Sequence, residues 1–405
     1  MVPLSFSEIK KKYKNICFLS FDPQYQKEID MLLLFFSAAG FNAFMAADFD
    51  GLMGKYFNYR MSYGDPTDPK IEMREELIRH EALLKEKGVP IEETDESDTL
   101  FVLLNSMRLP IINEEAQVSL WKLGKEKECA FYDLKRRCFH KCSGPVLVKT
   151  EYSIALHCNL KCKGCSHYSN LIDEPKFGDI SAFSKTLARL GELFDDILLI
   201  NLLGGEPLLN KNIGDFIHEA KRQFPNATIQ LLTNGLLIPR LDEQTLAVFR
   251  RYKVVLNITN YPPTDAVKDR IKQVLTAHGI AHMFNRTVST FDYFVGETEC
   301  DPELNFRCCT AKVCHNLFDD GRLSVCGQPL FYDGIKHKLE VKRELSDRDW
   351  IDIYKEANGY EVLSKLHTPI PYCKYCNETN KVYFQWEAPY RRELREDDPC
   401  LIRVK

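Results

Sequence analysis

Three cysteines stand within a short stretch of this chain, Cys158-Asn-Leu-Lys-Cys162-Lys-Gly-Cys165, and the rest of the sequence is organised around them. A four-iron cluster takes four thiolates when the protein fills every coordination position. Three ligands in one tight loop therefore leave one iron open for a small molecule to chelate. Clustered cysteines are also typical of structural zinc, and the loop alone does not separate the two interpretations.

A second motif follows the next strand-like segment. Residues 197–203 form an apolar run with the length and composition of a buried parallel strand, and the run ends in Gly204-Gly205-Glu206-Pro207. Two glycines let a ligand approach the backbone closely. Glu206 offers a carboxylate to a cationic partner. The sequence thus predicts a ligand site at the end of this strand.

The two motifs, in this order, resemble those of the radical S-adenosylmethionine (radical SAM) superfamily over roughly residues 148–290. The resemblance implies that the open iron chelates the amino and carboxylate groups of the methionine moiety, and that the Gly204–Pro207 stretch receives the amino group. The residue before the third cysteine is often aromatic in the family and packs near the adenine. Here it is Gly164, so Tyr168 or His167 is the candidate for that role.

The bulk composition excludes several classes of protein. A chain of 405 residues with a net charge of −4 has room for two or three domains and carries no basic stripe for nucleic acid. No apolar run reaches the length of a membrane span and the N-terminus lacks the regions of a signal peptide, so we expect a cytoplasmic protein without a membrane span. In a reducing compartment, the 15 cysteines are metal ligands or buried thiols rather than disulfides.

Residues 1–145 are predicted to form a small α/β, Rossmann-like domain with a mostly parallel sheet, because strand-like and helix-like segments alternate. The strands are expected at 15–21, 41–46, 99–105 and 129–134, and the helices at 27–39, 72–87 and 114–123. No Gly-x-Gly-x-x-Gly motif supports a dinucleotide site. Our hypothesis is that this domain docks a substrate or partner. We interpret residues 51–70 as a solvated connection rather than a lid, and Cys138 to Cys142 as linker or packing.

Residues 146–298 repeat strand-helix units, which suits the partial (β/α)6 barrel that the family resemblance implies. Polar residues at the ends of two barrel strands, where such barrels build their sites, are candidates for contacts with the ribose and carboxylate of the cofactor. They are Thr233, Asn234, Thr259 and Asn260. Turn formation is the alternative explanation, because Asn-Gly and Asn-Tyr-Pro-Pro both favour turns.

Residues 299–405 hold a second concentration of cysteines. Residues 313–326 are typical of a β-hairpin with an Asp-Asp-Gly turn, and this hairpin ends in Cys326. Cys373 and Cys376 follow as a Cys-x2-Cys pair. A hairpin ending in cysteine plus such a pair suits zinc or an iron–sulfur cluster.

Beside a radical SAM barrel, this pattern resembles the twitch domain, a shortened SPASM domain that holds one auxiliary [4Fe-4S] cluster. Gly321 to Cys326 matches the Gly-x4-Cys element of that family, and Cys373/Cys376 match its pair. Two cysteines compete for the first ligand. Cys309 has the usual distance to the glycine, whereas Cys314 continues directly into the hairpin. For the tail at 383–395 we weigh a cover over the auxiliary site, or an anion contact, against a solvated helix end, and favour the helix end.

The resemblance implies an enzyme that uses SAM and a [4Fe-4S] cluster to form a 5′-deoxyadenosyl radical, with an electron donor such as flavodoxin or ferredoxin. The run from Cys158 through Ser166-His167-Tyr168-Ser169 looks most like radical SAM proteins encoded with glycan-building genes. We therefore predict hydrogen abstraction from a carbohydrate or related small polar substrate, giving oxidation or epimerisation. Peptide or protein modification is the runner-up. A non-catalytic zinc scaffold is the alternative of another class, and it leaves Gly-Gly-Glu-Pro without a role. The sequence assigns no catalytic residue.

Overall fold

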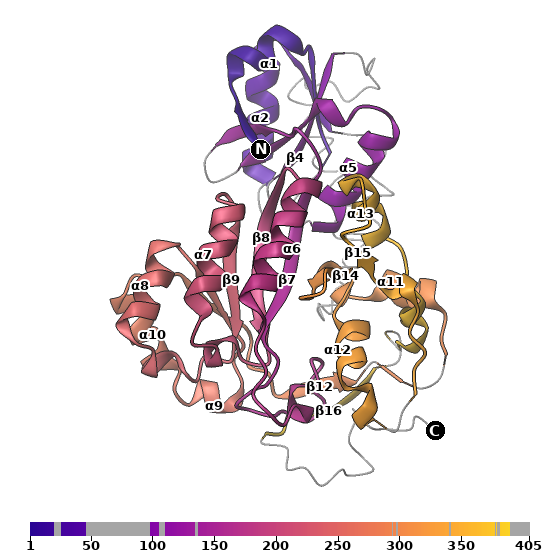
Figure 1. Ribbon diagram of the computed structural model, residues 1–405. Coiled ribbons are helices and arrows are strands. Elements are labelled where there is room, and N and C mark those ends of the chain that lie inside the picture. The colour runs from indigo at the N-terminus through magenta and orange to yellow at the C-terminus, as the bar shows by residue number, and fades with distance from the viewer. Residues whose placement is uncertain are drawn as a thin grey trace.

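Figure 1 shows a three-part molecule in a computed structural model, with the N-terminal sheet at the top, the strand-helix units at the lower left and the cysteine-rich part at the lower right. The structure describes residues 1–19, 26–45, 98–104, 110–133, 137–293, 295–296, 299–339, 342–376, 378 and 381–388. The expected helix at 72–87 and the connection at 51–70 lie outside the described residues. No helix of the described part is long and apolar enough to cross a membrane.

The N-terminal sheet has the strand order β1-β6-β5-β4-β2-β3. Its strands are β1 (Val2–Leu4), β2 (Asn15–Phe18), β3 (Asn42–Met45), β4 (Thr99–Leu104), β5 (Cys129–Asp133) and β6 (Cys138–Lys141). Strands β3, β2, β4 and β5 are neighbours in that order and pair in parallel. Strands β6 and β1 add an antiparallel edge. The expected mostly parallel sheet is confirmed. The stretch predicted as linker or packing is strand β6, and Cys142 packs beside Cys129 in the core.

Within the described residues, three helices accompany this sheet: α1 (Phe6–Lys12), α2 (Gln26–Ala38) and α5 (Pro110–Lys122). Helix α5 lies between the two large sheets. Its Ala116 and Leu120 pack with residues of the first sheet and with the start of β7, while Val118 belongs to the core of the second sheet. The amide of Gln117 both accepts from the Val146 N–H at 2.7 Å and donates to the Val146 carbonyl at 3.0 Å. These bonds satisfy backbone groups at an otherwise open strand edge.

The second sheet has the order β11-β10-β9-β8-β7-β13-β14-β15. Its first five strands in sequence are β7 (Val146–Ala155), β8 (Asp196–Gly204), β9 (Thr228–Thr233), β10 (Val255–Ile258) and β11 (His282–Phe284). The helices between them are α6 (Ile180–Leu193), α7 (Ile213–Gln223), α8 (Glu243–Arg251), α9 (Pro262–Asp265) and α10 (Lys268–Ala277). All neighbouring strands from β11 to β13 are parallel. The α/β fold with its parallel sheet is confirmed, and β13 takes the sixth parallel position.

The cysteine-rich part contributes strands to the same sheet. β13 (Asn316–Leu317) and β14 (Arg322–Ser324) form the expected hairpin, and β14 pairs with β15 (Ile351–Asp352). The helices of this part are α11 (Pro302–Cys308), α12 (Gln328–Ile335) and α13 (Gly359–Leu366). Since β13 hydrogen-bonds to β7, the sheet crosses the boundary that we expected at residues 298/299.

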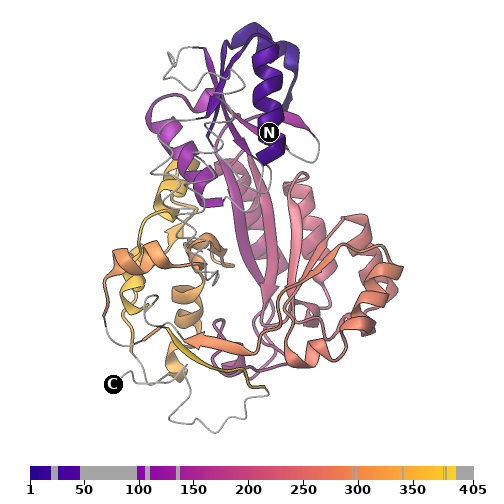
Figure 2. The ribbon, with the colours of Figure 1, turned by 180° about the vertical axis from the view of Figure 1, so that it is seen from behind.

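A two-stranded ribbon joins the end of the barrel segment to the C-terminal tail. β12 (Thr290–Tyr293) and β16 (Val382–Gln385) pair in antiparallel fashion, and Figure 2 shows the ribbon crossing below the large sheet. The solvated helix end that we favoured for residues 383–395 is therefore wrong for 383–385, because the backbone of these residues forms part of strand β16. The arginines after Trp386 and Cys400 lie outside the described residues.

Candidate functional site

The cysteine loop follows the carboxyl end of β7, where the strand of a parallel sheet normally presents a site. The Leu160 N–H donates to Sγ of Cys158 at 3.4 Å, which holds the first turn of the loop. Asn234, after β9, donates its amide to the Asn159 side chain at 2.7 Å. The loop is thereby tied to the end of a strand two positions away in the sheet.

Two of the three thiols of this loop are in an environment that disfavours the thiolate. Burial raises the pKa of Cys158 to about 11 and that of Cys162 to about 12. Both groups therefore hold their protons at neutral pH unless a cation displaces them. A bound metal supplies that displacement, since metal ligation deprotonates cysteine.

The two glycines of Gly204-Gly205 make room for backbone rather than only for a ligand. A Cβ on Gly204, whose φ is +144°, would lie 1.9 Å from the carbonyl oxygen of Ala155. A Cβ on Gly205 would lie 2.3 Å from the carbonyl oxygen of His157. The end of β8 thus passes directly against the chain that enters the cysteine loop, and only glycine permits this approach.

Glu206 lies beneath the site, fully buried. Its carboxylate accepts hydrogen bonds from the Thr233 hydroxyl at 2.7 Å, the Asn234 N–H at 2.8 Å and the Leu208 N–H at 3.0 Å. Burial raises the pKa of Glu206 to about 7, against the effect of these donors. The carboxylate that we expected to face a cationic partner therefore joins the ends of β8 and β9.

A cavity of about 280 Å³ opens beside the cysteine loop. Its lining combines all three loop cysteines with five of the residues predicted to contact the cofactor: Gly204, Gly205, Thr233, Asn234 and Thr259. The other four predicted residues do not line it. Glu206 and Pro207 are buried below, Asn260 donates to Asp265 and Thr287, and Tyr168 is buried elsewhere.

Of the two aromatic candidates for the adenine, His167 lines the cavity and Tyr168 does not. The ring of His167 lies 4.6 Å from that of Phe331, and Nδ1 is 2.8 Å from the Gly204 carbonyl oxygen. Burial lowers the pKa of His167. The Tyr168 hydroxyl instead donates to Gln328, in the cysteine-rich part.

Aromatic residues that sequence reasoning missed close the other side of the cavity. Trp386, just after β16, donates its indole N–H to Sγ of Cys162 at 3.3 Å and stacks on Tyr261 at 5.5 Å between ring centroids. Tyr261 and Phe291 both line the cavity. The aromatic run in the tail was the available signal, but its partner strand is remote in sequence.

The residues present fit an iron–sulfur cluster with a chelating small molecule. Three thiols and several hydroxyl and amide groups share one cavity, and Ser169 lines it with a buried hydroxyl that has no hydrogen-bond partner among the described residues. Buried polar atoms are normally satisfied, so this hydroxyl is available to a ligand.

Four cysteines of the C-terminal part lie near one another: Cys309, Cys326, Cys373 and Cys376. Burial raises the pKa of Cys309 and of Cys376, and in both cases the neighbouring Cys326 and Glu378 raise it further. Burial raises the pKa of Cys326 too, with Cys373 adding to it. The side chain of Asn305 donates to the carbonyl oxygens of Cys373 and Cys376, which holds their turn.

Cys314 faces the barrel strand β7 instead. Its Sγ lies 4.0 Å from Nζ of Lys149, and burial raises the pKa of its thiol to about 12, with Glu151 acting in the same direction. Of the two candidates for the first auxiliary ligand, Cys309 is the one placed beside Cys326 and Cys376. The auxiliary cluster itself stays a prediction.

Comparison with known proteins gives one family. Residues 152–309 match the profile of the radical SAM superfamily. A GTP 3′,8-cyclase from Heliobacterium modesticaldum (strain ATCC 51547 / Ice1) is 30% identical over 97 residues, which are 24% of this chain and 29% of that protein. The chain thus matches less than a third of the length of this curated relative.

Solved structures overlap only in part. A structure described as anSMEcpe with bound AdoMet is 17% identical, with a TM-score of 0.31 and coverage of 36% of this chain and 44% of that one. BtrN in complex with AdoMet and 2-DOIA is 18% identical, with a TM-score of 0.34 and coverage of 56% and 92%. Because these scores are low, the assignment rests on the sequence profile, which covers both the Cys158–Cys165 loop and Gly204–Pro207. The chain carries a domain of the radical SAM superfamily, whose members use SAM and a [4Fe-4S] cluster.

Proposed function

We propose that this chain is a radical SAM enzyme that abstracts a hydrogen atom from a carbohydrate-like or related small polar substrate held inside the barrel. The observation that carries the proposal is a row of polar side chains across the inner face of the sheet. When bound, the cluster and SAM would supply a 5′-deoxyadenosyl radical. The residues described here would hold these groups and shape the space in which the substrate lies.

The polar row follows from the alternation of side chains along the strands. Tyr152 on β7, Ile200 on β8 and Ile229 on β9 belong to the core under the helices. Their neighbours therefore point to the opposite, inner face. Glu151 is in register with Asn201, and Asn201 is in register with Gln230. Asn201, a polar residue inside the apolar run at 197–203, is the sequence signal for this row.

The row has hydrogen-bonding capacity to spare. The Asn201 amide N–H donates to the Glu151 carboxylate at 3.0 Å, and the Asn257 amide N–H donates to Oε1 of Gln230 at 3.4 Å. The side-chain oxygens of both asparagines are buried without a hydrogen-bond partner among the described residues. A substrate with hydroxyl donors would satisfy them, whereas an apolar substrate would leave them unpaired.

Charge is present in the same place. The Lys149 ammonium is 2.8 Å from the Glu151 carboxylate. Burial would raise the pKa of Glu151, but the adjacent Lys149 lowers it, so the carboxylate is ionised at neutral pH. A paired lysine and carboxylate give the barrel interior one acceptor and one donor for a polyol.

The enclosure of the polar row supports a small substrate over a polypeptide, because Glu151, Asn201 and Gln230 are each at most 8% exposed. The β12–β16 ribbon also borders the cavity at the cysteine loop, through Phe291 and Asp292. A peptide would need a longer open groove at this position. Peptide modification is therefore our second choice.

The four C-terminal cysteines would hold an auxiliary cluster. In this proposal the auxiliary cluster carries electrons for a net oxidation of the substrate.

The test starts with anaerobically prepared full-length protein that contains about eight irons per chain. It is incubated with SAM, dithionite and either a panel of sugars, nucleotide sugars and cyclitols or a panel of peptides, and 5′-deoxyadenosine is measured. We expect a member of the first panel to raise 5′-deoxyadenosine formation and, when deuterated, to pass deuterium into it. Stimulation by peptides alone would show that the substrate class is wrong.

A pair of variants links the result to the polar row. Asn201→Leu is expected to reduce the stimulation at least tenfold while leaving the unstimulated formation of 5′-deoxyadenosine unchanged, because the cysteine loop is untouched. Gln223→Leu, on α7 at the opposite face of the sheet, is the control and should keep full stimulation. Equal stimulation in both variants would remove the row from the argument. Absence of 5′-deoxyadenosine in the iron-replete wild type would reject the radical reaction itself.

A further inference from the structure

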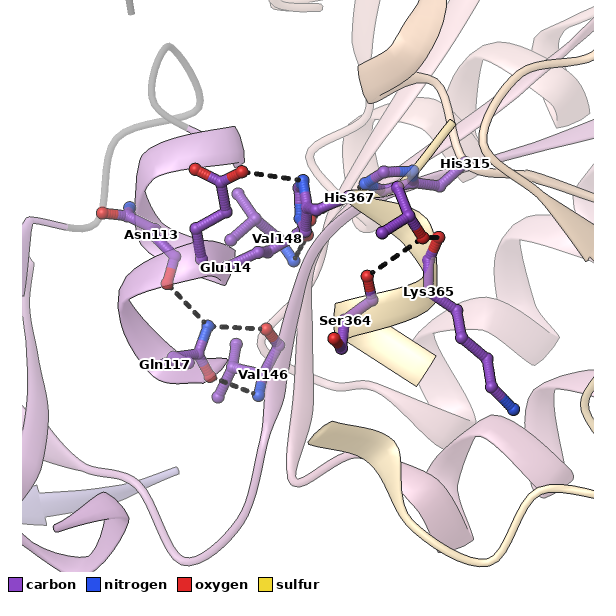
Figure 3. A network of polar contacts seen from close by, with 11 residues as sticks. Asn113, Glu114, Gln117, Val146, Val148, His315, Ser364, Lys365 and His367 are labelled. Atoms are coloured by element: carbon purple, nitrogen blue, oxygen red, sulfur yellow. Dashed lines mark hydrogen bonds and ion pairs between the residues drawn. The ribbon is translucent and has the colours of Figure 1, made fainter. Parts of the chain in front are cut away.

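Three titratable side chains converge where the three parts of the molecule meet. Glu114 comes from α5, His315 immediately precedes β13, and His367 follows the last turn of α13. Figure 3 shows the three side chains directed toward one another from these separate segments. The group lies at the start of β7, because Glu114 also accepts from the Val148 N–H at 2.7 Å. The cysteine loop follows the other end of the same strand.

The geometry of the group is that of a ligand set. Nε2 of His315 lies 2.9 Å and Nε2 of His367 lies 2.8 Å from the same oxygen, Oε2 of Glu114. One ligand atom from each residue falls within 4.8 Å of the others. Around a tetrahedral zinc ion, nitrogen and oxygen ligands at about 2.0–2.1 Å would be roughly 3.3 Å apart. An outward shift of about half an ångström therefore admits an ion.

The group is buried and needs a positive charge. The side chains of Glu114 and His315 are 0% exposed and that of His367 is 8% exposed. A buried carboxylate is costly without a cation. His367 also lies at the carbonyl end of α13, where a helix favours positive charge.

The surroundings resemble the support of a metal site. Oε1 of Glu115 lies 4.0 Å from Nδ1 of His367, in the place of the carboxylate that commonly orients a metal-bound histidine. His315 has a left-handed backbone, with φ of +45°. Such a conformation is unusual for a residue with a side chain and is held here by the bond from its N–H to the Val325 carbonyl.

We propose that Glu114, His315 and His367 bind one divalent zinc ion that joins the N-terminal sheet, the barrel strand β7 and the cysteine-rich part. Two imidazole nitrogens and one carboxylate oxygen suit zinc, whereas magnesium and calcium prefer oxygen ligands alone. Because the site is buried and lies at the opposite end of β7 from the cysteine loop, the ion has a structural role. It is independent of the iron–sulfur chemistry.

The experiment compares two histidines in the same structural position. His278, like His367, follows the last turn of a helix and pairs with a glutamate, Glu243, at 3.6 Å, but on the surface. Full-length wild type, His367→Asn, Glu114→Gln and His278→Asn are prepared anaerobically with reconstituted clusters. Each is given one equivalent of zinc and desalted, and zinc and iron are counted. We expect about one zinc per chain in the wild type and His278→Asn, none in the other two, and equal iron in all four.

Zinc bound at vacant cysteine sites is distinguished by its ligands. Zinc X-ray absorption of the wild type should show nitrogen and oxygen neighbours at about 2.0–2.1 Å and no sulfur at about 2.3 Å. Addition of zinc should raise the Tm of the wild type and His278→Asn only. Sulfur-bound zinc in the wild type, or equal zinc in wild type and His367→Asn, would overturn the proposal and leave a proton-linked hydrogen-bond network. The absorption result decides the matter even where a variant fails to fold.

Discussion

Single buried residues at the site determine how its strands meet. Glu206 is the strongest case, because burial raises its pKa to about 7 while its ordinary value is 4.5. Glu206 therefore binds its proton more tightly in the folded protein than in the unfolded chain. Its contribution to stability is complete below pH 4.5 and is lost as pH rises through 7, amounting to roughly 3 kcal/mol by pH 8. Glu206→Gln cannot ionise, so the difference in Tm between variant and wild type should grow in favour of the variant from pH 5 to pH 8. Parallel Tm curves would contradict this pKa.

Gly204 gives a second prediction at this scale. Gly204→Ala places a Cβ against the Ala155 carbonyl oxygen at a position with positive φ, and neither group can move freely. We expect a loss of roughly 2–4 kcal/mol and a reduced iron content, because Ala155 leads into the cysteine loop. Gly334→Ala is the matched control, since nothing lies within 4 Å of its Cβ and it stands in helix α12. That variant should be unchanged or stabilised by about 0.5–1 kcal/mol. Thermal unfolding and iron analysis measure both.

Among the elements, the β12–β16 ribbon leads directly into residues that contact the cysteine loop. The indole of Trp386 donates to Sγ of Cys162, and hydrogen bonds to ligand sulfurs raise the potential of an iron–sulfur cluster. Trp386→Phe should therefore lower the midpoint potential of this cluster by roughly 50 mV, the equivalent of one hydrogen bond of about 1 kcal/mol. A redox titration followed by EPR measures the shift. Tyr383→Phe, on the adjoining strand β16 but 69% exposed, should leave the potential unchanged. Identical potentials in all three proteins would mean that the bond is absent in the holoenzyme.

Elements are also where sequence reasoning worked best and where it failed. Apolar periodicity of 2 or 3.6 located β7 to β11 and their helices, since each forms from a contiguous segment. The turn residues Asp319-Asp320-Gly321 located the hairpin of β13 and β14. Nothing local indicates that Val382–Gln385 pairs with Thr290–Tyr293, or that Glu114 meets His315 and His367, because these contacts join distant segments. The cysteine motif could be identified from the sequence because its ligands are close together in the chain. The role of Glu206 could not, because it depends on the burial of its carboxylate in the folded protein.

At the scale of the whole molecule, α5 connects the parts. Trp121 stacks on Tyr360 of α13 at 5.6 Å with an interplanar angle of 4°, while other residues of α5 pack on both sheets. Trp121→Ala should lower the stability by about 1–3 kcal/mol. It should also raise amide exchange both in β2 and β4 and in β13 to β15. Leu123→Ala, a neighbouring residue that is 66% exposed, should change neither. Faster exchange confined to the N-terminal sheet would show that the parts unfold separately.

The pairing of β13 with β7 has a consequence for the engineering of this protein. A chimera that replaced everything after residue 298 would remove the partner of Glu151 and Tyr152 and would leave one edge of the central sheet open. Open strand edges pair readily with other chains, so such a construction would aggregate before its catalytic properties could be compared. Exchanges of the cysteine-rich part should retain residues 313–325 and the β15 strand of the recipient. A donor segment should then replace only the chain between residue 325 and β15 and the chain that follows β15.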